Sequence, residues 1–237
     1  DRIKIYVIYA SQKKGCRHMA SWLTHLRVAE KIKQKIPEID FPYFLIGSIA
    51  PDSGVSDEKQ RNYTPSKEIT HYRYQKDDSI SGMDDSVFFD SYLKPEKIMT
   101  RSDSTRSFLW GYYFHLITDK LWLEEYFMPL KIQYENESSK GGKDFVDFIR
   151  EEMVSLDFEY LEEKGTELIN QLKDFNGNIS FFSEFDSDYI YECKDRIADF
   201  YSGEPINLNK EYKFLTLQKI EDFVVKAAEK CISILII

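Results

Sequence analysis

Residues 111–122 read GYYFHLITDKLW, and this stretch decides how the rest of the chain must be organised. It is strongly apolar, yet it carries His115 and, four residues later, Asp119. Burying an imidazole and a carboxylate without partners costs several kcal/mol. We therefore expect other parts of the chain to bring groups that satisfy these two side chains.

The pattern on either side of this stretch predicts an all-α protein. Apolar residues at helical spacing recur along the chain, with capping residues before them and Pro or Gly after them. We expect helices over 21–36, 84–94, 103–128, 143–174, 183–202 and 214–236, and a short apolar helix over 42–50. Pro129 is expected to end the longest apolar helix, and the polar residues 55–82 predict a long loop. Strand signals are weak after residue 18, so we predict a single-domain helical bundle.

The first residues differ from the rest. Residues 1–18 contain one strand-like run, IKIYVIYA, followed by basic and small residues. Met19 opens MASWLTHLRVAEKI, which reads like a natural start. We interpret 1–18 as an N-terminal extension, not necessarily native, before one helical domain over 19–237. An ordinary edge strand is the alternative interpretation.

Composition narrows the class of protein. The formal net charge of −9 does not favour a general nucleic-acid-binding surface, which needs clustered Lys and Arg. The cysteines Cys16, Cys193 and Cys231 form no CxxC pair, so neither a disulfide framework nor a thiolate zinc site is indicated. This usage suits a reducing compartment, and we expect a cytoplasmic protein. No apolar run reaches the roughly 18 residues that a transmembrane segment requires.

His115 and Asp119 are candidates for metal ligands. Positions four apart lie on one helix face, about 5–6 Å apart at Cβ, so both side chains can converge on one cation. Gly111 lies one turn earlier on this face and leaves room for another segment to approach. The alternative is a histidine–aspartate hydrogen bond that only stabilises a buried helix.

Two further residues complete a plausible donor set. Asp52 lies in the turn APDSG, and His71 lies in the polar segment that follows. Together with His115 and Asp119 they make a two-His, two-Asp set that suits zinc, manganese or iron. His25 is then available to hold a second ion, with Asp119 bridging the two. Paired ions about 3.5–4 Å apart are a common device for phosphoryl chemistry.

These residues carry a resemblance to a known family. The blocks MASWLTHLRVAEKI, YFLIGSIAPDSG, EITHY and GYYFHLITDKLW, in this order over residues 19–130, resemble the bacterial zinc-dependent phospholipase C family. The same helical fold serves the fungal single-strand nucleases. The resemblance implies an all-α fold in which Asp52, His71, His115 and Asp119 hold one zinc. It also implies a second ion held by His25, by a bridging Asp119, and by the amino group and carbonyl of an N-terminal tryptophan.

The sequence departs from this family in two places. Trp22 lies near His25, but it is internal unless the chain is cut just before it. The extracellular family members use two later histidines and an acidic residue for another zinc, whereas no histidine follows His115 here. That third site is therefore absent or rebuilt from acidic residues. The candidates are Glu184, Asp186 and Asp188, for which the start of a solvated helix is the alternative reading.

The function that these residues favour is metal-dependent hydrolysis of a small phosphoester or a phospholipid. One or two zinc ions would activate water, and Asp52 would serve as the general base. Arg61, Lys67 and Arg73 are candidates to contact phosphate, although loop charges are often only solvated. Groups that hydrogen-bond the second ring nitrogen of each histidine ligand should fix its tautomer. The candidates by proximity are Thr24, Thr70 and Thr118.

Three other readings remain open at this stage. A metal-binding protein without hydrolytic turnover, such as a sensor or a degenerate relative, fits the missing later histidines. The helical HD-type phosphohydrolases rely on an adjacent His-Asp pair, which this sequence lacks. A structural protein with satisfied core histidines is the third alternative. Oligomeric state cannot be read from the sequence.

Overall fold

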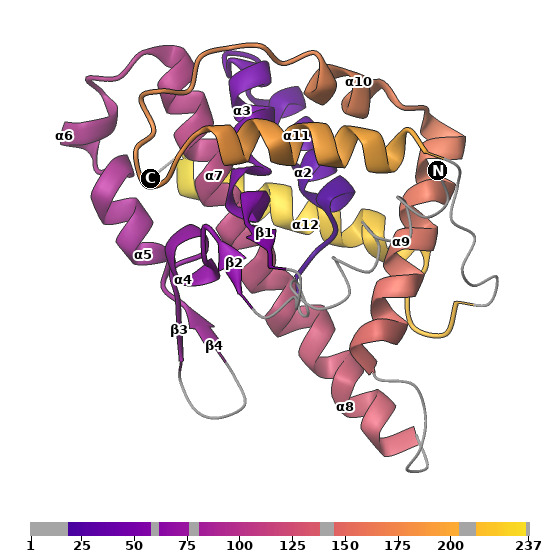
Figure 1. The fold of residues 1–237 in the computed structure, drawn as a ribbon. Helices are drawn as coiled ribbons and strands as arrows, with labels where there is room; N and C mark the ends of the chain where they lie inside the picture. The colour runs from indigo at the N-terminus through magenta and orange to yellow at the C-terminus, as the bar shows by residue number, and fades with distance from the viewer. Residues whose placement is uncertain (1–18, 58–61, 76–80, 138–144, 204–211, 236–237) are drawn as a thin grey trace.

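Helix α7 (Asp103–Trp122) runs through the middle of the molecule, and the functional candidates gather around it (Figure 1). The computed structural model describes residues 19–57, 62–75, 81–137, 145–203 and 212–235. The helix begins at the predicted place, because the Ser102 hydroxyl accepts the N–H of Thr105 at 3.3 Å. Along its length α7 packs against α3 (Phe41–Gly47) and α12 (Leu217–Leu235).

Helix α2 (Trp22–Lys35) lies against both α12 and α7. The Ser21 hydroxyl caps it by accepting the N–H of Thr24 at 3.2 Å, as the sequence predicted. Its apolar stripe, which includes Leu23, Leu26 and Ile32, is fully buried. This packing places the start of α2, and His25 one turn further on, against the middle of α7.

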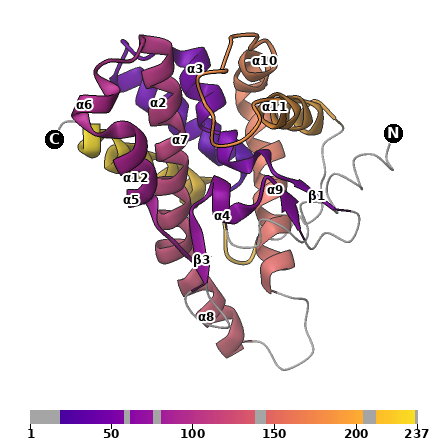
Figure 2. The same cartoon turned by 60° about the vertical axis from the view of Figure 1, so that its left-hand side comes forward.

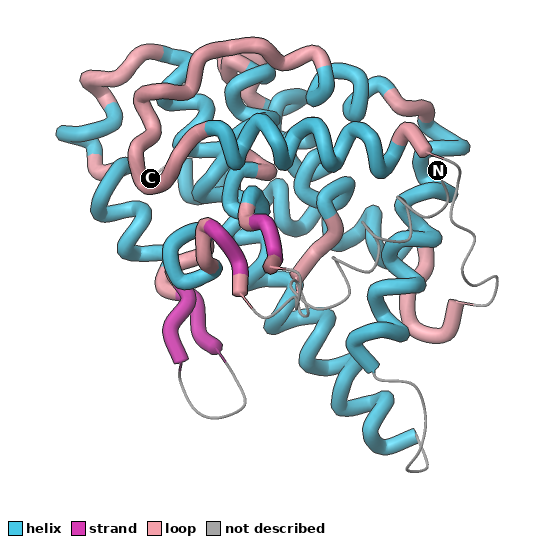
Figure 3. Tube along the Cα trace, viewed as in Figure 1, coloured by secondary structure: helices cyan, strands magenta, loops and turns pink. Residues whose placement is uncertain are grey.

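The segment 55–82 differs from the predicted loop. After the short 3₁₀ turn η1 (Ala50–Ser53), it forms two small antiparallel hairpins with a four-residue helix between them. The elements are β1 (Val55–Ser56), β2 (Tyr63–Thr64), α4 (Lys67–Thr70), β3 (Arg73–Gln75) and β4 (Ser81–Met83). Figure 3 shows the β3–β4 hairpin extending away from the helices. Strand is sparse among the described residues, as expected, but these short strands replace part of the predicted loop, because strands of two or three residues carry almost no periodic signal.

The middle of the chain shows two further differences. The predicted helix 84–94 is formed by α5 (Asp85–Phe88) and the π-helical turn η2 (Phe89–Leu93), and α6 (Pro95–Ile98) follows it. Pro129 does not end the long apolar helix as predicted. The chain continues from α7 through the π-helical turn η3 (Leu123–Phe127) into α8 (Met128–Glu137). The wider turn precedes Pro129, so a residue without an N–H is accommodated.

The second half of the chain covers the site from the other side. The predicted helix 143–174 is two helices, α9 (Phe145–Lys164) and α10 (Glu167–Lys173), because Gly165 adopts a left-handed φ of 86° between them. Helix α11 (Asp188–Tyr201) packs against α10 and η1. Figure 2 shows α9 and α11 on one side of α7, with α5 and α6 on the other.

One hydrophobic core joins these helices, from Ala20 to Cys231. Two of the three cysteines, Cys193 and Cys231, are buried thiols in the hydrophobic core. The third, Cys16, and the strand-like run of the first eighteen residues lie outside the described residues. No helix in the described part of the chain is both long enough and apolar enough to cross a membrane.

Candidate metal centre

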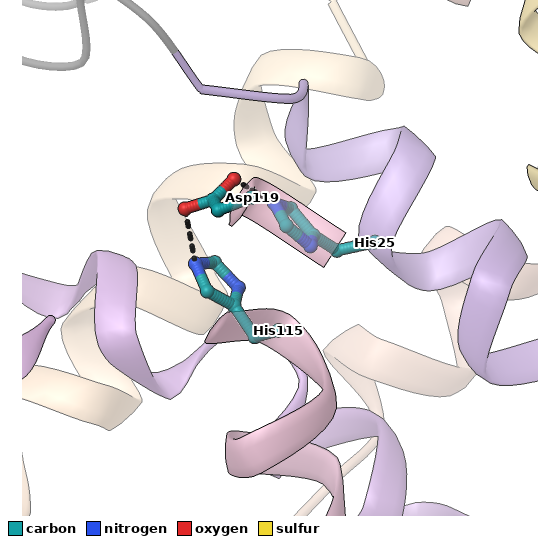
Figure 4. A group of neighbouring side chains, drawn as sticks. All are labelled: His25, His115 and Asp119. Carbon is teal, nitrogen blue, oxygen red and sulfur yellow. Dashed lines mark ion pairs between the residues drawn. The ribbon is translucent and has the colours of Figure 1, made fainter. Parts of the chain in front are cut away.

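His115 and Asp119 face each other on α7 in the interior of the protein. The Nε2 atom of His115 lies 3.3 Å from Oδ2 of Asp119, and each residue is only 1% exposed. Figure 4 shows Asp119 beside the rings of His115 and His25, with one carboxylate oxygen turned toward each. The pair predicted from the HxxxD spacing is therefore present and fully buried.

Gly111 allows α3 to approach this face of α7. A Cβ at Gly111 would lie 2.3 Å from the carbonyl oxygen of Phe44, so no larger residue fits without moving α3. The close approach brings the Ser48 carbonyl oxygen to 2.8 Å from Nδ1 of His115. Because a carbonyl only accepts, His115 carries a proton on Nδ1, and its Nε2 lone pair points toward Asp119 when the ring is neutral.

His71 and Asp52 come from α4 and η1 to the same point. The Nε2 atom of His71 lies 3.3 Å from Nε2 of His115, 3.6 Å from Oδ2 of Asp119 and 3.5 Å from Oδ1 of Asp52. His71 has no exposed surface, and Asp52 is 5% exposed. The convergence of four side chains from three separate segments, which the sequence predicted, is present.

Four of the six separations among these donor atoms match the edges of a tetrahedral metal site. Nitrogen and oxygen ligands bind zinc at about 2.0–2.2 Å, and the edges of such a tetrahedron measure about 3.3–3.6 Å. The measured separations run from 3.3 to 3.6 Å. The Oδ2 atom of Asp119 also has no hydrogen-bond donor. The residues present therefore fit a bound divalent ion.

His25 approaches the other oxygen of Asp119. Its Nε2 lies 3.2 Å from Oδ1, and its ring stacks on that of His115 at 3.7 Å between centroids. Both His25 nitrogens are buried without a hydrogen-bond partner, which is uncommon and costly in a protein interior. Asp119 is thus placed to bridge two cation positions, with His25 belonging to the second.

The backbone of Ala20, not Trp22, occupies the remaining place at Asp119. The Ala20 amide donates to Oδ1 of Asp119 at 3.2 Å. Trp22 packs edge-on against Phe200 at 5.9 Å and stays in the core. The departure noted for Trp22 is therefore present: Trp22 packs in the core, and Ala20, two residues earlier, has its nitrogen at the centre.

Lys67 lies at the edge of the centre. Its Nζ donates to Oδ1 of Asp52 at 2.7 Å and lies 3.4 Å from Nε2 of His71. The residue is 8% exposed. The sequence suggested Lys67 only as a loop residue and a candidate to contact phosphate, whereas the structure places its ammonium among the candidate ligands. Arg73 lies in β3, and Arg61 falls outside the described residues.

The buried charges shift one another's pKa. Burial lowers the pKa of His25, and burial together with the Lys67 ammonium holds the pKa of His71 well below its usual value. For His115, burial opposes protonation, but the Asp119 carboxylate outweighs it and raises the pKa. Burial also opposes ionisation of Asp119, but His115 and His25 outweigh it and lower the pKa. The centre thus favours an ionised Asp119 beside neutral His25 and His71, which attract a cation, whereas His115 must release a proton from Nε2 before it can bind one.

Of the three threonines proposed as tautomer-fixing partners, one has that role. The Thr70 hydroxyl lies 2.8 Å from Nδ1 of His71. Thr24 contacts Ser21, and Thr118 donates to the carbonyl of Phe114. For His115, the Ser48 carbonyl described above takes this part, and the sequence carried no signal for it.

The acidic residues suggested for a third ion lie in other interactions. Glu184 accepts the hydroxyl of Tyr92, and Asp186 accepts the N–H of Asp188 at 3.0 Å. The Asp186 contact supports the alternative of a helix start, since α11 begins at Asp188. Within the described residues, the grouped histidines and carboxylates that could hold an ion are the five around α7.

A pocket of about 50 Å³ adjoins the centre. Asp52 and Ala20 belong to its wall, and most of the remaining wall is apolar. Those apolar residues are Met19, Trp22, Trp122, Phe127, Val146, Ile149, Met153 and Val154. The indole N–H of Trp122, also in the wall, is buried without a hydrogen-bond acceptor among the described residues. A small ligand that accepts hydrogen bonds would fit beside Asp52.

The polar character of the centre is built by helix packing. α2, α3, α7, η1 and α4 each contribute to it, and none of the five candidate ligands is more than 5% exposed.

Comparisons with protein-family models, with curated proteins and with solved structures found no match to this chain.

Proposed function

We propose that this chain is a metal-dependent phosphoester hydrolase of the kind that the bacterial zinc-dependent phospholipase C family represents. The observation that carries the proposal is the meeting of four buried side chains around His71 and His115, in which four of the six donor–donor separations are 3.3–3.6 Å, the edge length of a zinc tetrahedron. Zinc is the first choice of ion, with manganese or iron as further candidates for a mixed imidazole and carboxylate set.

The protein residues have separate roles in this proposal. Asp52, His71, His115 and Oδ2 of Asp119 hold the first ion, while His25 and Oδ1 of Asp119 face the second position. When bound, such an ion lowers the pKa of water toward 7 and polarises a phosphoryl oxygen. Asp52 lies in the pocket wall and is ionised at neutral pH, since the Lys67 ammonium outweighs burial and holds its pKa well below the usual range. Its carboxylate can therefore accept the proton of attacking water.

The pocket beside Asp52 supports a small phosphoester or a phospholipid headgroup as substrate. The Trp122 indole N–H has no acceptor among the described residues and is the donor that we propose for a phosphoryl oxygen, and the apolar walls suit an apolar substituent. The family resemblance adds a prediction about the second ion. A chain that began at Ala20 would present an amine in place of the amide that now donates to Asp119. Such a chain should bind a second ion more tightly than the full chain does.

The experiment is a metal and activity measurement on the full chain. Purified protein is loaded with zinc or manganese, its metal content is determined by elemental analysis, and hydrolysis of bis(4-nitrophenyl) phosphate is followed. We expect bound metal and turnover, both lost in His115→Ala. Leu116→Ala is the matched control, because it opens a cavity at the next buried residue of α7 and removes no ligand. Metal-free wild-type protein, or His115→Ala with full metal content, would refute the proposal.

A metal-binding protein without turnover is the second candidate. Two observations favour it: no histidine follows His115 to build a third site, and Lys67 contacts Asp52 and His71. Tight zinc binding that depends on His115, with no hydrolysis of phosphomonoesters or phosphodiesters, would select this alternative over the hydrolase.

A further inference from the structure

Lys67 is a buried cation placed against two of the candidate metal ligands. It opens helix α4 and lies four residues before His71, so both side chains project from the same face. Its Nζ lies 2.7 Å from Oδ1 of Asp52 and 3.4 Å from Nε2 of His71. At 8% exposure, the ammonium is largely removed from water. Lysine is rarely buried this deeply unless it is paired.

The two atoms that Lys67 contacts belong to the four-atom set of the proposed metal site. An ammonium can only donate hydrogen bonds, so the Nε2 atom of His71 must accept through its lone pair. A neutral imidazole has one such lone pair, since its other nitrogen carries the proton, here directed to the Thr70 hydroxyl at 2.8 Å. That single lone pair can face either Lys67 or a metal ion. At Asp52 the ammonium and the ion would also lie as like charges on one carboxylate oxygen.

We propose that Lys67 is a built-in cation that competes with the metal ion at the Asp52–His71 edge of the centre. In the metal-free protein its ammonium offsets the buried charge of Asp52 and holds Asp52 and His71 in place. When an ion binds, the contact between the Lys67 ammonium and Nε2 of His71 is lost. The repulsion between the two positive charges then weakens metal binding. This inference rests on the metal-binding part of the proposed function and is independent of hydrolysis.

The alternative is that Lys67 supports metal binding by orienting Asp52. Partners of ligating carboxylates commonly do so, and their removal weakens metal affinity. The two roles predict opposite signs. Removing a competing cation tightens metal binding and destabilises the metal-free protein, whereas removing an orienting partner weakens metal binding. A purely structural lysine would change stability and leave metal affinity unaltered.

The test uses the full chain as wild type, Lys67→Met and a control variant. Lys194→Met is the matched control, because Lys194 is 9% exposed and its Nζ donates to the carbonyls of Lys173 and Phe175, away from the centre. Zinc affinity is measured by competition with a chromogenic chelator, and thermal unfolding is followed with and without zinc. Lys67→Gln, which keeps polarity without charge, serves if Lys67→Met fails to fold.

We expect Lys67→Met to bind zinc at least about tenfold more tightly than wild type, as the loss of a like charge near the ion requires. The same variant should unfold at a lower temperature without metal, and added zinc should raise that temperature by more than it does for wild type. Lys194→Met should keep the wild-type zinc affinity. Unchanged or weaker zinc binding by both Lys67 variants would overturn the role of Lys67 alone. Absence of zinc binding in every protein, including wild type, would overturn the metal site itself.

Discussion

Two buried carboxylates in this protein, Glu152 and Asp119, have very different surroundings. Glu152 in α9 is fully buried and accepts the backbone N–H groups of Lys213, Phe214 and Leu215, which lead into α12. Asp119 in α7 is 1% exposed and is approached by three imidazole rings. The carboxylate of Glu152 meets only donors and needs nothing more. The carboxylate of Asp119 accepts the Ala20 N–H at Oδ1, but its Oδ2 atom has no hydrogen-bond donor and lies among imidazole nitrogens, an arrangement that suits a cation.

The comparison separates a structural buried charge from a candidate functional one. Donors around Glu152 make it an anchor for a loop, in keeping with the rule that buried polar groups are hydrogen-bonded. At Asp119 the Oδ2 atom and both nitrogens of His25 have no hydrogen-bond partner. Native proteins tolerate such groups where a ligand or an ion satisfies them. Five predictions test this distinction.

The largest effect is expected for Glu152→Ala. The variant removes the acceptor of the N–H groups of buried Phe214 and Leu215 and of exposed Lys213, which should lower the free energy of unfolding by about 3–5 kcal/mol. Denaturant titration with and without zinc measures it. The loss should be the same in both conditions, because Glu152 is not at the centre. A loss that zinc reverses would mean that the two regions are not separate.

Asp119→Ala should weaken zinc binding strongly and change the metal-free stability little, the reverse of Glu152→Ala. We expect zinc affinity to fall at least about 100-fold, or about 2.7 kcal/mol, because the residue contributes an oxygen to both cation positions. The metal-free stability should change far less than in Glu152→Ala, since Asp119 lacks that network of donors. Isothermal titration with zinc and unfolding of the metal-free protein measure the two quantities. Undiminished zinc affinity would remove Asp119 from the site.

Gly111→Ala tests the helix contact that positions His115. The added Cβ would meet the Phe44 carbonyl at 2.3 Å, and overpacking of this kind costs about 1–3 kcal/mol. We expect both lower stability and weaker zinc binding, because Ser48 moves with α3. Gly165→Ala is the control: its φ of 86° makes alanine strained, but the site lies elsewhere. Equal zinc affinity in the two variants would contradict the positioning role.

Asp157 is a third buried carboxylate, intermediate between Glu152 and Asp119 in the number of donors around it. It accepts the hydroxyls of Tyr201 at 2.7 Å and Ser21 at 3.0 Å, and burial raises its pKa to about 7. The folded state therefore holds a proton that the unfolded state releases near pH 4. Stability should fall by about 1.4 kcal/mol per pH unit as pH rises from about 5 to 7. In Asp157→Asn this decline in the free energy of unfolding should be absent. Urea unfolding at several pH values between about 5 and 7 measures it. Parallel pH profiles for the two proteins would contradict it.

The smallest effect is expected for Thr70→Val. The substitution keeps the shape and removes the hydroxyl at Nδ1 of His71, and loss of such a partner typically costs about 10-fold in metal affinity or more. Thr118→Val is the control, since its hydroxyl bonds the carbonyl of Phe114. Zinc competition assays compare the two. If Thr118→Val weakens zinc binding as much as Thr70→Val does, the effect is not specific to the centre.

Sequence reasoning succeeded where periodicity and capping act within one segment. The caps Ser21 and Ser102 and the HxxxD face of α7 are local features, and each was found where the pattern placed it. It failed at Pro129, where a π-helical turn lets the helix continue, and at the hairpins of two or three residues between 55 and 83. These features depend on tertiary packing, which overrides local preference.

The centre was partly predictable for the same reason. Histidine is rare in this chain, so four positions were easy to weigh, and a family-like order of blocks suggested which of them meet. The Ser48 carbonyl and the Ala20 amide could not be found, because any residue type supplies a backbone group. Lys67 was assigned to solvent or phosphate, because sequence cannot tell a buried lysine in a short helix from an exposed one.

The distance along the chain between the donors has a consequence for chain integrity. Ala20 and Asp119 are 99 positions apart and touch at one point, with Asp52 and His71 between them in sequence. An ion there would cross-link these segments and close three loops of the polypeptide at once. Chelation should then first release the short α4 segment, which has only four helical residues of its own. Protease cleavage confined to that segment would report the loss of the ion before the helices unfold.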